Sequence, residues 1–384
     1  MKHLPLKALA RFSTAALIGM SMLSQSANAS VIASSRTHPS NTVMRPIFTT
    51  LPARGVNYAT LGFQAAAGQT LPSFTDSVKS PLNNQTYSYT LVGSDPKTSL
   101  VSTTVNYIPI MVRVHFADGT ILDPSKPGCN DTKSVRLRFF AGPMFRNTPL
   151  VSNGINVGNT QIEDGFMRAE FWSLVQNSNY HVLLKRAAKP VLVDYTAPAG
   201  SSTSAGRCSG SNHNLGKIDI NAYDSELVSL TNQYATPTQL PIIMAYNLVL
   251  TESGSCCVIG YHSAYGRSGG TQVYANGAYL DDGFFNVPIE DIHAWVHEVG
   301  EAFNDPFVNN NVPAWGHIGQ QPGCQNNLEV GDPLTGTPFP LTYKGFAYHP
   351  QELVFFDWFF RTPAQGTGGV YSFEGTFKTT QGTC

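Results

Sequence analysis

The chain has 384 residues, of which 42% are hydrophobic and only 13% are charged. This charged fraction is about half of the usual quarter, which excludes a disordered polyelectrolyte, a coiled coil and a histone-like nucleic-acid binder. The 34 glycines and 25 prolines follow no collagen-like period. The composition therefore predicts a turn-rich globular protein, long enough for one large domain or two smaller ones.

Residues 1–29 have the pattern of a secretory signal peptide. Three basic side chains precede the short apolar stretch 12–23, and a small-x-small cleavage site ends at Ala29. A membrane-spanning helix would need about 20 apolar residues. Cleavage would leave 21 of the 24 basic residues against all 25 acidic ones, a net charge of −4 that indicates no polyanionic partner. We expect a secreted or periplasmic protein that meets no nucleic acid and, after cleavage, no membrane. No sequence feature sets its oligomeric state.

All six cysteines follow this cleavage site, namely Cys129, Cys208, Cys256, Cys257, Cys324 and Cys384. An even number in an exported chain predicts up to three disulfides, with 15 possible pairings. Thiolate ligation of a metal is the alternative, which the lack of a Cys-x-x-Cys pair disfavours. Because Cys256 and Cys257 are adjacent, we expect them to bond to two different partners.

Residues 30–95 are rich in Ser, Thr, Pro and Asn. We expect an extended or loosely structured N-terminal region there, followed by a single domain over 96–384. The alternating pattern of 103–121, with Asp118 and Gly119 as its turn, predicts a β-hairpin.

Helical and extended patterns then alternate along the chain. Apolar residues at helical spacing predict a helix over 160–172, and a strand follows at 180–184. The Ser/Gly-rich segment 197–211 contains Cys208 and should be a surface loop tied down by a disulfide. Beyond it we expect strands at 215–220, 241–250 and 272–280, a helix at 224–231 and a buried helix at 350–361. Strands alternating with helices indicate a mixed α/β sheet.

The segment 286–306 is the most informative part of the chain. Pro288 suits the first turn of a helix, acidic residues follow it, and Pro306 blocks continuation. At about 100° per residue, four apolar side chains share an arc that should face the sheet, and four polar side chains share the opposite arc. The apolar set is Ile292, Val296, Val299 and Phe303, and the polar set is His297, Glu298, Glu301 and Asp305.

His297 and Glu301 form a pair suited to a metal ion. Residues four apart lie one turn above each other on a helix and can direct two donor atoms at one ion. Glu298 lies beside them, where it could act as general base toward a water molecule. This His-Glu-x-x-Glu pattern resembles the His-Glu-x-x-His helix of zincin metallopeptidases, with a carboxylate in place of the second imidazole. The alternative is a solvated polar helix face.

A third protein ligand must come from elsewhere, because two residues alone do not hold zinc. The candidates are Asp305, His317, Glu329 and Asp332. His293 could form an alternative pair with His297, and His262 could donate a hydrogen bond to a developing oxyanion.

A family resemblance covers roughly residues 256–333. The motifs follow one another as His297-Glu298-x-x-Glu301, Asp305-Pro306, Ala314-Trp315 and Glu329-Val330-Gly331-Asp332. This order resembles the exordium-like (phosphate-induced) secreted proteins and related bacterial exported proteins. The family's last Asp is followed by Cys, where this chain has Pro333, and Cys324 could supply an equivalent bridge. The resemblance implies an extracellular protein with a zincin-like site, and it supports Glu329 or Asp332 as the further ligand.

The sequence therefore predicts an α+β fold: a zincin-like mixed sheet with an active-site helix and a β-rich N-terminal part. Our leading hypothesis is a secreted zinc-dependent hydrolase, metallopeptidase-like, that acts on peptides or proteins. Glu298 would be the general base, and His297, Glu301 and either Glu329 or Asp332 would hold the metal. The alternative is a non-catalytic extracellular protein with structural zinc or calcium, because carboxylates suit calcium about as well.

Overall fold

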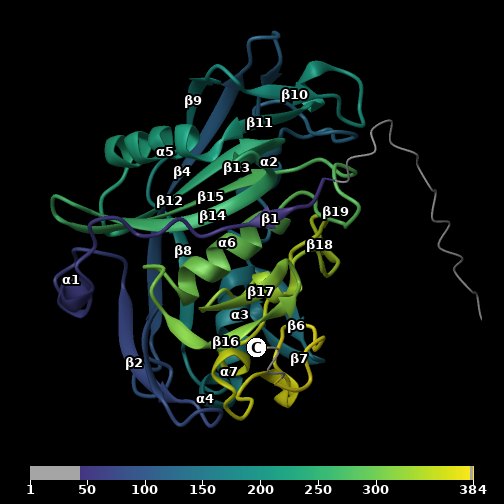
Figure 1. Ribbon diagram of the computed structural model, residues 1–384. Helices are drawn as coiled ribbons and strands as arrows, with labels where there is room; N and C mark the ends of the chain where they lie inside the picture. The colour runs from purple at the N-terminus through teal and green to yellow at the C-terminus, as the bar shows by residue number, and fades with distance from the viewer. Residues whose placement is uncertain (1–43, 381–383) are drawn as a thin grey trace, which may run out of the picture. The chain divides into compact units, whose positions relative to one another are not determined.

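The computed structural model describes residues 44–380 and residue 384, so the predicted signal peptide lies outside the described residues. Eleven strands form a central sheet (Figure 1). These strands are β1 (Ile47–Phe48), β4 (Ser102–His115), β5 (Ile121–Leu122), β8 (His181–Arg186), β9 (Val191–Thr196), β10 (Ser202–Ser204), β11 (Leu215–Asp219), β12 (Gln239–Tyr246), β13 (Leu248–Glu252), β14 (Ser255–Arg267) and β15 (Gly270–Tyr279).

The sheet is mixed, as predicted. Its path runs β10-β11-β13-β14-β15-β12-β4-β5, with β1 paired to β14 and both β8 and β9 paired to β4. Strand β12 is parallel to β4 and β15, whereas β14 is antiparallel to β13 and β15. The predicted hairpin over 103–121 is confirmed as the antiparallel pair β4–β5.

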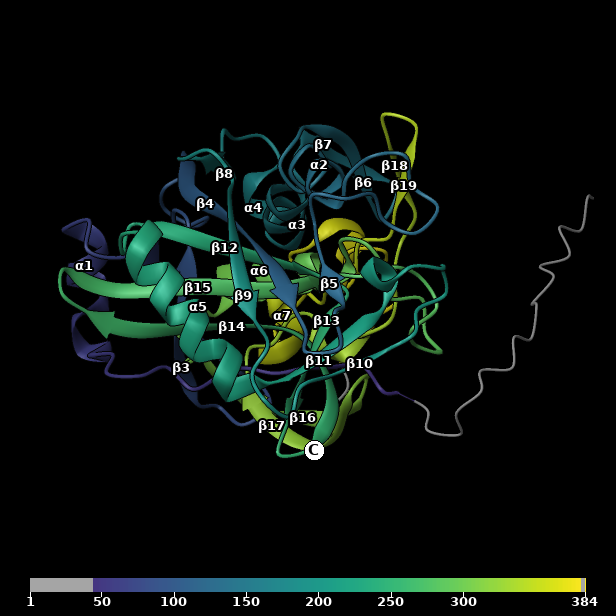
Figure 2. The same ribbon diagram turned by 90° about the horizontal axis from the view of Figure 1, so that it is seen from above.

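Helices cover both faces of this sheet. Figures 1 and 2 show α5 (Ile220–Tyr234) on one side and α6 (His293–Asn304) on the other, with α3 (Ile162–Glu170) on the side of α6. Along β12, Met244 packs into the core that contains α3 and α6, and its neighbour Ile243 packs into the core under α5. Successive strand residues point to opposite faces, so a strand covered on both sides is apolar throughout.

Four hairpins and shorter helices complete the described part of the chain. The hairpins are β2–β3 (Ser73–Lys79, Thr86–Val92), β6–β7 (Thr148–Ser152, Ile155–Thr160), β16–β17 (Asn311–Ile318, Gln321–Asn327) and β18–β19 (Leu341–Tyr343, Phe346–Tyr348). The helices are α1 (Leu61–Ala66), α2 (Val135–Phe140), α4 (Trp172–Val175), α7 (Phe356–Phe360) and the 3-10 turns Tyr58–Thr60, Ser211–His213, Asp332–Leu334 and Thr367–Gly369.

The N-terminal region is more regular than we expected. Within the described residues 44–95, α1 and the hairpin β2–β3 replace the loosely structured arm. Tyr89 and Leu91 of β3 are buried in the core, at 3% and 0% exposed. The polar composition hid this hairpin because its outward-facing residues are mostly Ser and Thr.

Two further elements differ from their predicted bounds. The apolar run 241–250 is not one strand, because Asn247 adopts the left-handed conformation (φ 49°) and separates β12 from β13. Its side chain holds this bend by bonding to Asp281, through Nδ2 to Oδ2 at 2.9 Å and through Oδ1 to the backbone N–H at 2.8 Å. The buried helix expected over 350–361 is only α7, and Gln351 and Val354 form isolated β-bridges before it.

The helix expected over 286–306 begins later, at His293. Asp291 pairs with Leu280 in an isolated β-bridge and has a φ of 45°, so the chain before the helix is held away from helical geometry. The Asp291 carboxylate also accepts the backbone N–H of His349 at 3.0 Å. The end of the helix agrees with the prediction, because α6 stops at Asn304, two residues before Pro306.

The six cysteines form three disulfides, which confirms their predicted number. The pairs are Cys129–Cys208, Cys256–Cys257 and Cys324–Cys384. The bond at Cys208 ties down the segment 197–211 as expected, but this segment is not a loop throughout, because it contains strand β10 of the central sheet. The prediction that Cys256 and Cys257 take different partners is wrong, because these neighbours bond to each other.

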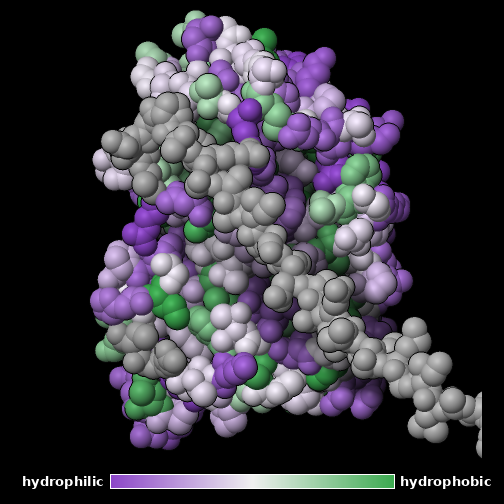
Figure 3. All heavy atoms as spheres, turned by 90° about the vertical axis from the view of Figure 1, so that its right-hand side faces the viewer, coloured by the Kyte–Doolittle hydropathy of each residue, from purple (hydrophilic) through white to green (hydrophobic). Residues whose placement is uncertain are grey.

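Among the described residues, no helix combines the length and the apolar composition that crossing a bilayer requires. On the face shown in Figure 3, hydrophobic side chains are scattered among hydrophilic ones in the coloured part of the chain.

Candidate metal centre

Helix α6 packs closely on strands β14 and β15 of the sheet, at a position where each strand has a glycine. Gly260 of β14 and Gly277 of β15 are register partners. A Cβ on Gly260 would lie 2.7 Å from Glu298 Cγ, and one on Gly277 would lie 3.1 Å from Trp295. A side chain at residue 260 would therefore force Glu298 to shift, and one at residue 277 would crowd Trp295. The helix face on the sheet carries Trp295 and Glu298, whereas Val296, which we expected there, packs against α3.

Both arcs of α6 are buried, so the alternative of a solvated polar face is wrong. All twelve residues of the helix are buried, and His297 and Glu298 are each 0% exposed. The sheet covers one side, and α3 with the segment after residue 338 covers another. Ionisable groups in such a place require partners or a bound cation.

The donor atoms of His297, Glu301 and Asp332 converge. His297 Nε2 lies 2.9 Å from Glu301 Oε1 and 3.5 Å from Asp332 Oδ1. One ligating atom from each residue lies within 4.8 Å of the other two. His297 and Glu301 come from successive turns of α6, and Asp332 opens a 3-10 turn after β17. Of the two candidates for the further ligand, Asp332 is the one whose carboxylate joins this group.

Gln351 determines which nitrogen of His297 faces these carboxylates. Its Nε2 donates to the carbonyl of Gly331 at 2.6 Å, so its Oε1 is the acceptor 3.1 Å from His297 Nδ1. His297 Nδ1 therefore carries a hydrogen. Its Nε2 is directed at Glu301 and Asp332 and has no hydrogen-bond partner among the described residues. An amide oxygen holding one nitrogen of a histidine while the other faces an ion is common in metal sites.

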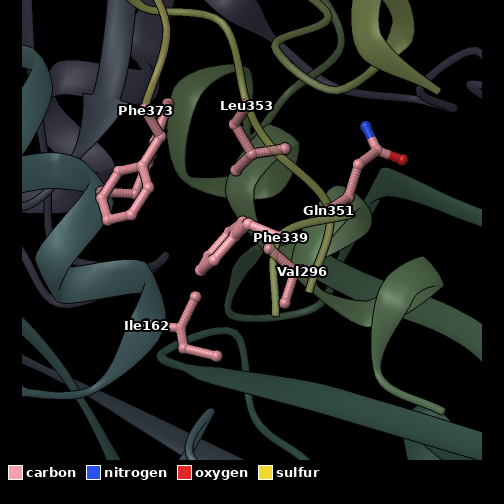
Figure 4. Close-up of a pocket in the computed structure, with 7 residues that line it drawn as sticks. Ile162, Val296, Phe339, Gln351, Leu353 and Phe373 are labelled. Carbon is pink, nitrogen blue, oxygen red and sulfur yellow. The ribbon is translucent and has the colours of Figure 1, made fainter. Parts of the chain in front are cut away.

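Packing also fixes the plane of the His297 ring. Phe48 of β1 stacks on it with ring centroids 3.4 Å apart and planes inclined by 10°. Gly331 lies against the same ring, since a Cβ there would come within 2.3 Å of Nδ1. Figure 4 shows the Gln351 amide pointing away from a small cavity lined otherwise by apolar side chains, among them Val296 and Leu353. The imidazole therefore has little freedom to turn.

Three glutamine amides hold the Asp332 carboxylate. Gln320 Nε2 donates to Oδ1, and Gln321 and Gln325 each donate to Oδ2 at 3.2 Å. Gln320 also bonds the backbone of Phe48 on both sides, accepting its N–H at 2.6 Å and donating to its carbonyl at 3.0 Å. The strand that covers His297 is therefore tied to the same carboxylate that faces it.

Glu298 and His262 form the other half of the centre. His262 lies on β14, and its Nε2 is 3.1 Å from the carbonyl of Asp305, which can only accept. Burial lowers the pKa of His262 to about 3, so the ring is neutral and its Nδ1 has a lone pair. That atom lies 3.4 Å from Glu298 Oε2 and 3.7 Å from Glu301 Oε2. Neither Glu298 oxygen has a hydrogen-bond partner among the described residues.

Several carboxylates repel one another in this buried space. Burial raises the pKa of Glu298, Glu301 and Glu329 well above the usual range, and the charges of neighbouring carboxylates raise each further. Glu329 forms a hydrogen bond with Glu301 and accepts one from Asn327 Nδ2 at 2.7 Å, so it positions the Glu301 carboxylate. A divalent cation would offset this excess of negative charge, and the unpartnered His297 Nε2, together with the Glu301 and Asp332 oxygens that face it, fits its ligation.

The remaining sequence candidates lie elsewhere. Asp305 accepts the backbone N–H groups of Asn309 and Asn310, which stabilises the turn after α6. His293 Nε2 accepts from the backbone of Gly336, so it does not pair with His297 at the donor group. His317 is exposed and lies 3.7 Å from Cys324 Sγ, beside the Cys324–Cys384 disulfide.

Sequence reasoning missed Phe48, Gln320 and Gln351 altogether. Phe48 and Gln351 lie far along the chain from α6, and none of the three has a spacing that marks it, so only the fold brings them to the centre. A scan against known protein families, a search of curated proteins and a search of solved structures each found no match to this chain. The function must therefore be inferred from the centre itself.

Proposed function

We propose that this protein is a secreted zinc-dependent hydrolase, metallopeptidase-like, with peptides or proteins as substrates. The observation that carries the proposal is the convergence of His297, Glu301 and Asp332 with the unpartnered carboxylate of Glu298 beside them. The resemblance of the His-Glu-x-x-Glu helix to zincins supports the same reading. Three disulfides and the signal-peptide pattern support export from the cell.

Each residue has a separate task in this proposal. His297, Glu301 and Asp332 would hold the ion, which when bound activates a water molecule and polarises a carbonyl. Glu298, whose pKa burial raises, would take a proton from the attacking water and return it to the leaving amine. The neutral His262 would border Glu298 on the sheet side without donating a hydrogen bond to it. Two carboxylate ligands donate more charge than two imidazoles would, so we expect slow or specialised cleavage.

The second candidate is a non-catalytic protein with a structural zinc or calcium ion at the same residues. Its support is the burial of the centre, because His297 and Glu298 have no exposed area and Phe48 covers the His297 ring. A carboxylate-rich donor set also suits calcium. Catalysis would require the strand that carries Phe48 to move, whereas a structural ion would not.

The deciding experiment uses the mature chain from residue 30. Elemental analysis of the purified protein measures zinc and calcium, and a library of fluorogenic peptides measures cleavage. We expect His297→Ala to lose both zinc and cleavage, and Glu298→Gln to keep zinc and lose cleavage. Stoichiometric zinc with no cleavage by the wild type, or stoichiometric calcium, would favour the structural alternative. A wild-type protein that holds neither metal would contradict both candidates.

A further inference from the structure

Two neighbouring hollows beside α2 and the end of β8 gather positive charge. One has a volume of about 400 Å³ and is lined by Arg136, Arg146, Arg186 and Lys189 around a floor that includes Leu137 and Phe140. The other has about 290 Å³ and is lined by Lys185 together with the same Arg146 and Arg186. Because two arginines line both hollows, we treat them as one feature, the arginine cleft.

The cations of the arginine cleft are unpaired. All five are exposed, and no described residue gives any of their side chains a hydrogen bond or an ion pair. Of the described residues, those that line the two hollows include no aspartate or glutamate. The chain has only 24 lysines and arginines and an overall negative balance. Five unpaired cations therefore make this region positively charged although the whole chain is slightly negative, and such a region attracts anions.

The fold assembles this cleft from three separate segments. Strand β8 pairs with the first half of β4 and ends at Arg186, and the chain then crosses to β9, which pairs with the second half of β4. Lys189 lies in this crossing, Arg136 lies on α2, and Arg146 lies between α2 and β6. Tyr107 of β4 lies beneath, and its pKa, which burial raises to about 12, is partly lowered by the charges of Arg186 and Arg146. Three of the five cations lie within residues 185–189, and the fold brings Arg136 and Arg146 to them.

We propose that the arginine cleft binds an acidic segment of polypeptide that also carries apolar side chains. Guanidinium groups bind carboxylates with two parallel hydrogen bonds, and two arginines shared by adjacent hollows can bind carboxylates in sequence along a chain. Leu137 on this floor is 50% exposed, and burying it against an apolar side chain of the ligand adds affinity that a purely charged ligand cannot use. This inference does not rest on the proposed hydrolase activity.

The floor argues against nucleic acid or a sulfated polysaccharide in the same place. Bases bind single-stranded-nucleic-acid proteins by stacking on open aromatic faces. Phe140 and Phe145 are only 6% exposed each, and Phe145 is already stacked on Tyr107 with centroids 4.7 Å apart. A phosphodiester or sulfate chain would meet the cations but leave the apolar floor uncovered.

Fluorescence anisotropy tests this on the full mature chain. The probes are a labelled peptide in which glutamate and leucine alternate, its glutamine–leucine counterpart and a glutamate–glycine peptide. We expect the first to bind most tightly, more weakly as salt is added. Arg146→Gln with Arg186→Gln should weaken it by about tenfold or more. The matched control, Lys79→Gln with Lys378→Gln, removes two exposed charges elsewhere and should change affinity less than about twofold.

Leu137→Gln separates the apolar part of the proposal from the charge. This substitution should weaken binding of the glutamate–leucine peptide and leave the affinity for the glutamate–glycine peptide unchanged. The proposal is overturned if the acidic peptides do not bind, if the two arginine substitutions act no more strongly than the lysine control, or if a heparin fragment or an oligonucleotide binds as tightly as the glutamate–leucine peptide. Circular dichroism of each variant establishes that it is folded.

Discussion

Gly331 offers the sharpest test of how the centre is built, because only a hydrogen atom fits between its backbone and His297. An alanine Cβ there would lie 2.3, 2.5 and 2.6 Å from Nδ1, Cγ and Cε1 of the imidazole. Ordinary contacts of this kind are about 3.5 Å or longer, so the ring would have to move by about 1 Å. Its φ of −89° is open to any residue, so the clash is the whole effect.

The His297 ring cannot easily yield to that methyl group. Phe48 stacks on it at 3.4 Å, and Gln351 bonds Nδ1 at 3.1 Å. We expect Gly331→Ala to lower the free energy of unfolding by about 1–3 kcal/mol, as other overpacked core substitutions do. Because the ring is also displaced from Glu301 and Asp332, we expect zinc affinity to fall about 10–100-fold.

Urea unfolding with and without zinc measures the stability change, and competition with a chelator measures the affinity. The control is Gly62→Ala in α1, where an added Cβ meets nothing within 4 Å. That change should be neutral or stabilising by up to about 1 kcal/mol. If Gly331→Ala unfolds at the same urea concentration as the control and retains zinc as the wild type does, the close packing of residue 331 on His297 is refuted.

Three other predictions follow from the same contacts. Phe48→Ala should lower the free energy of unfolding by about 3–5 kcal/mol. It should also speed the removal of zinc from His297 by a chelator, and an unchanged removal rate would contradict the covering role of this ring. Burial raises the pKa of Asp305 to about 7, so the folded state holds this proton more tightly than the unfolded chain. That stabilisation is complete below about pH 4 and is lost as pH rises through 7. In urea titrations between pH 4.5 and 7.5, the metal-free wild type should therefore lose more stability than Asp305→Asn. Equal losses would contradict the raised pKa of Asp305. Mass spectrometry of unreduced peptides should find Cys256 joined to Cys257, and a link from either to another cysteine would show the pairing to be wrong.

Short-range sequence patterns predicted those helices and strands that depend mainly on neighbouring residues. Helical spacing and Pro306 placed the helix that carries His297 and its end, although Asp291 delays its start by pairing with Leu280. Which face of that helix lies on the sheet was predicted wrongly in part, because the arc argument assumes that apolar residues meet the sheet. Here Gly260 brings the sheet close enough to accept Glu298 instead, and no periodicity in α6 reveals a glycine on another strand.

The sequence by itself determined that His297 and Glu301 stand one turn apart with Glu298 beside them, because the pitch of a helix acts over four residues. Only the tertiary structure decided that Asp332 joins them while Glu329 stays behind, and that His262 and Phe48 enclose the group. The same holds for the arginine cleft, whose cations come from three segments. Such contacts depend on strand register and on the packing of distant segments, which short-range patterns do not encode.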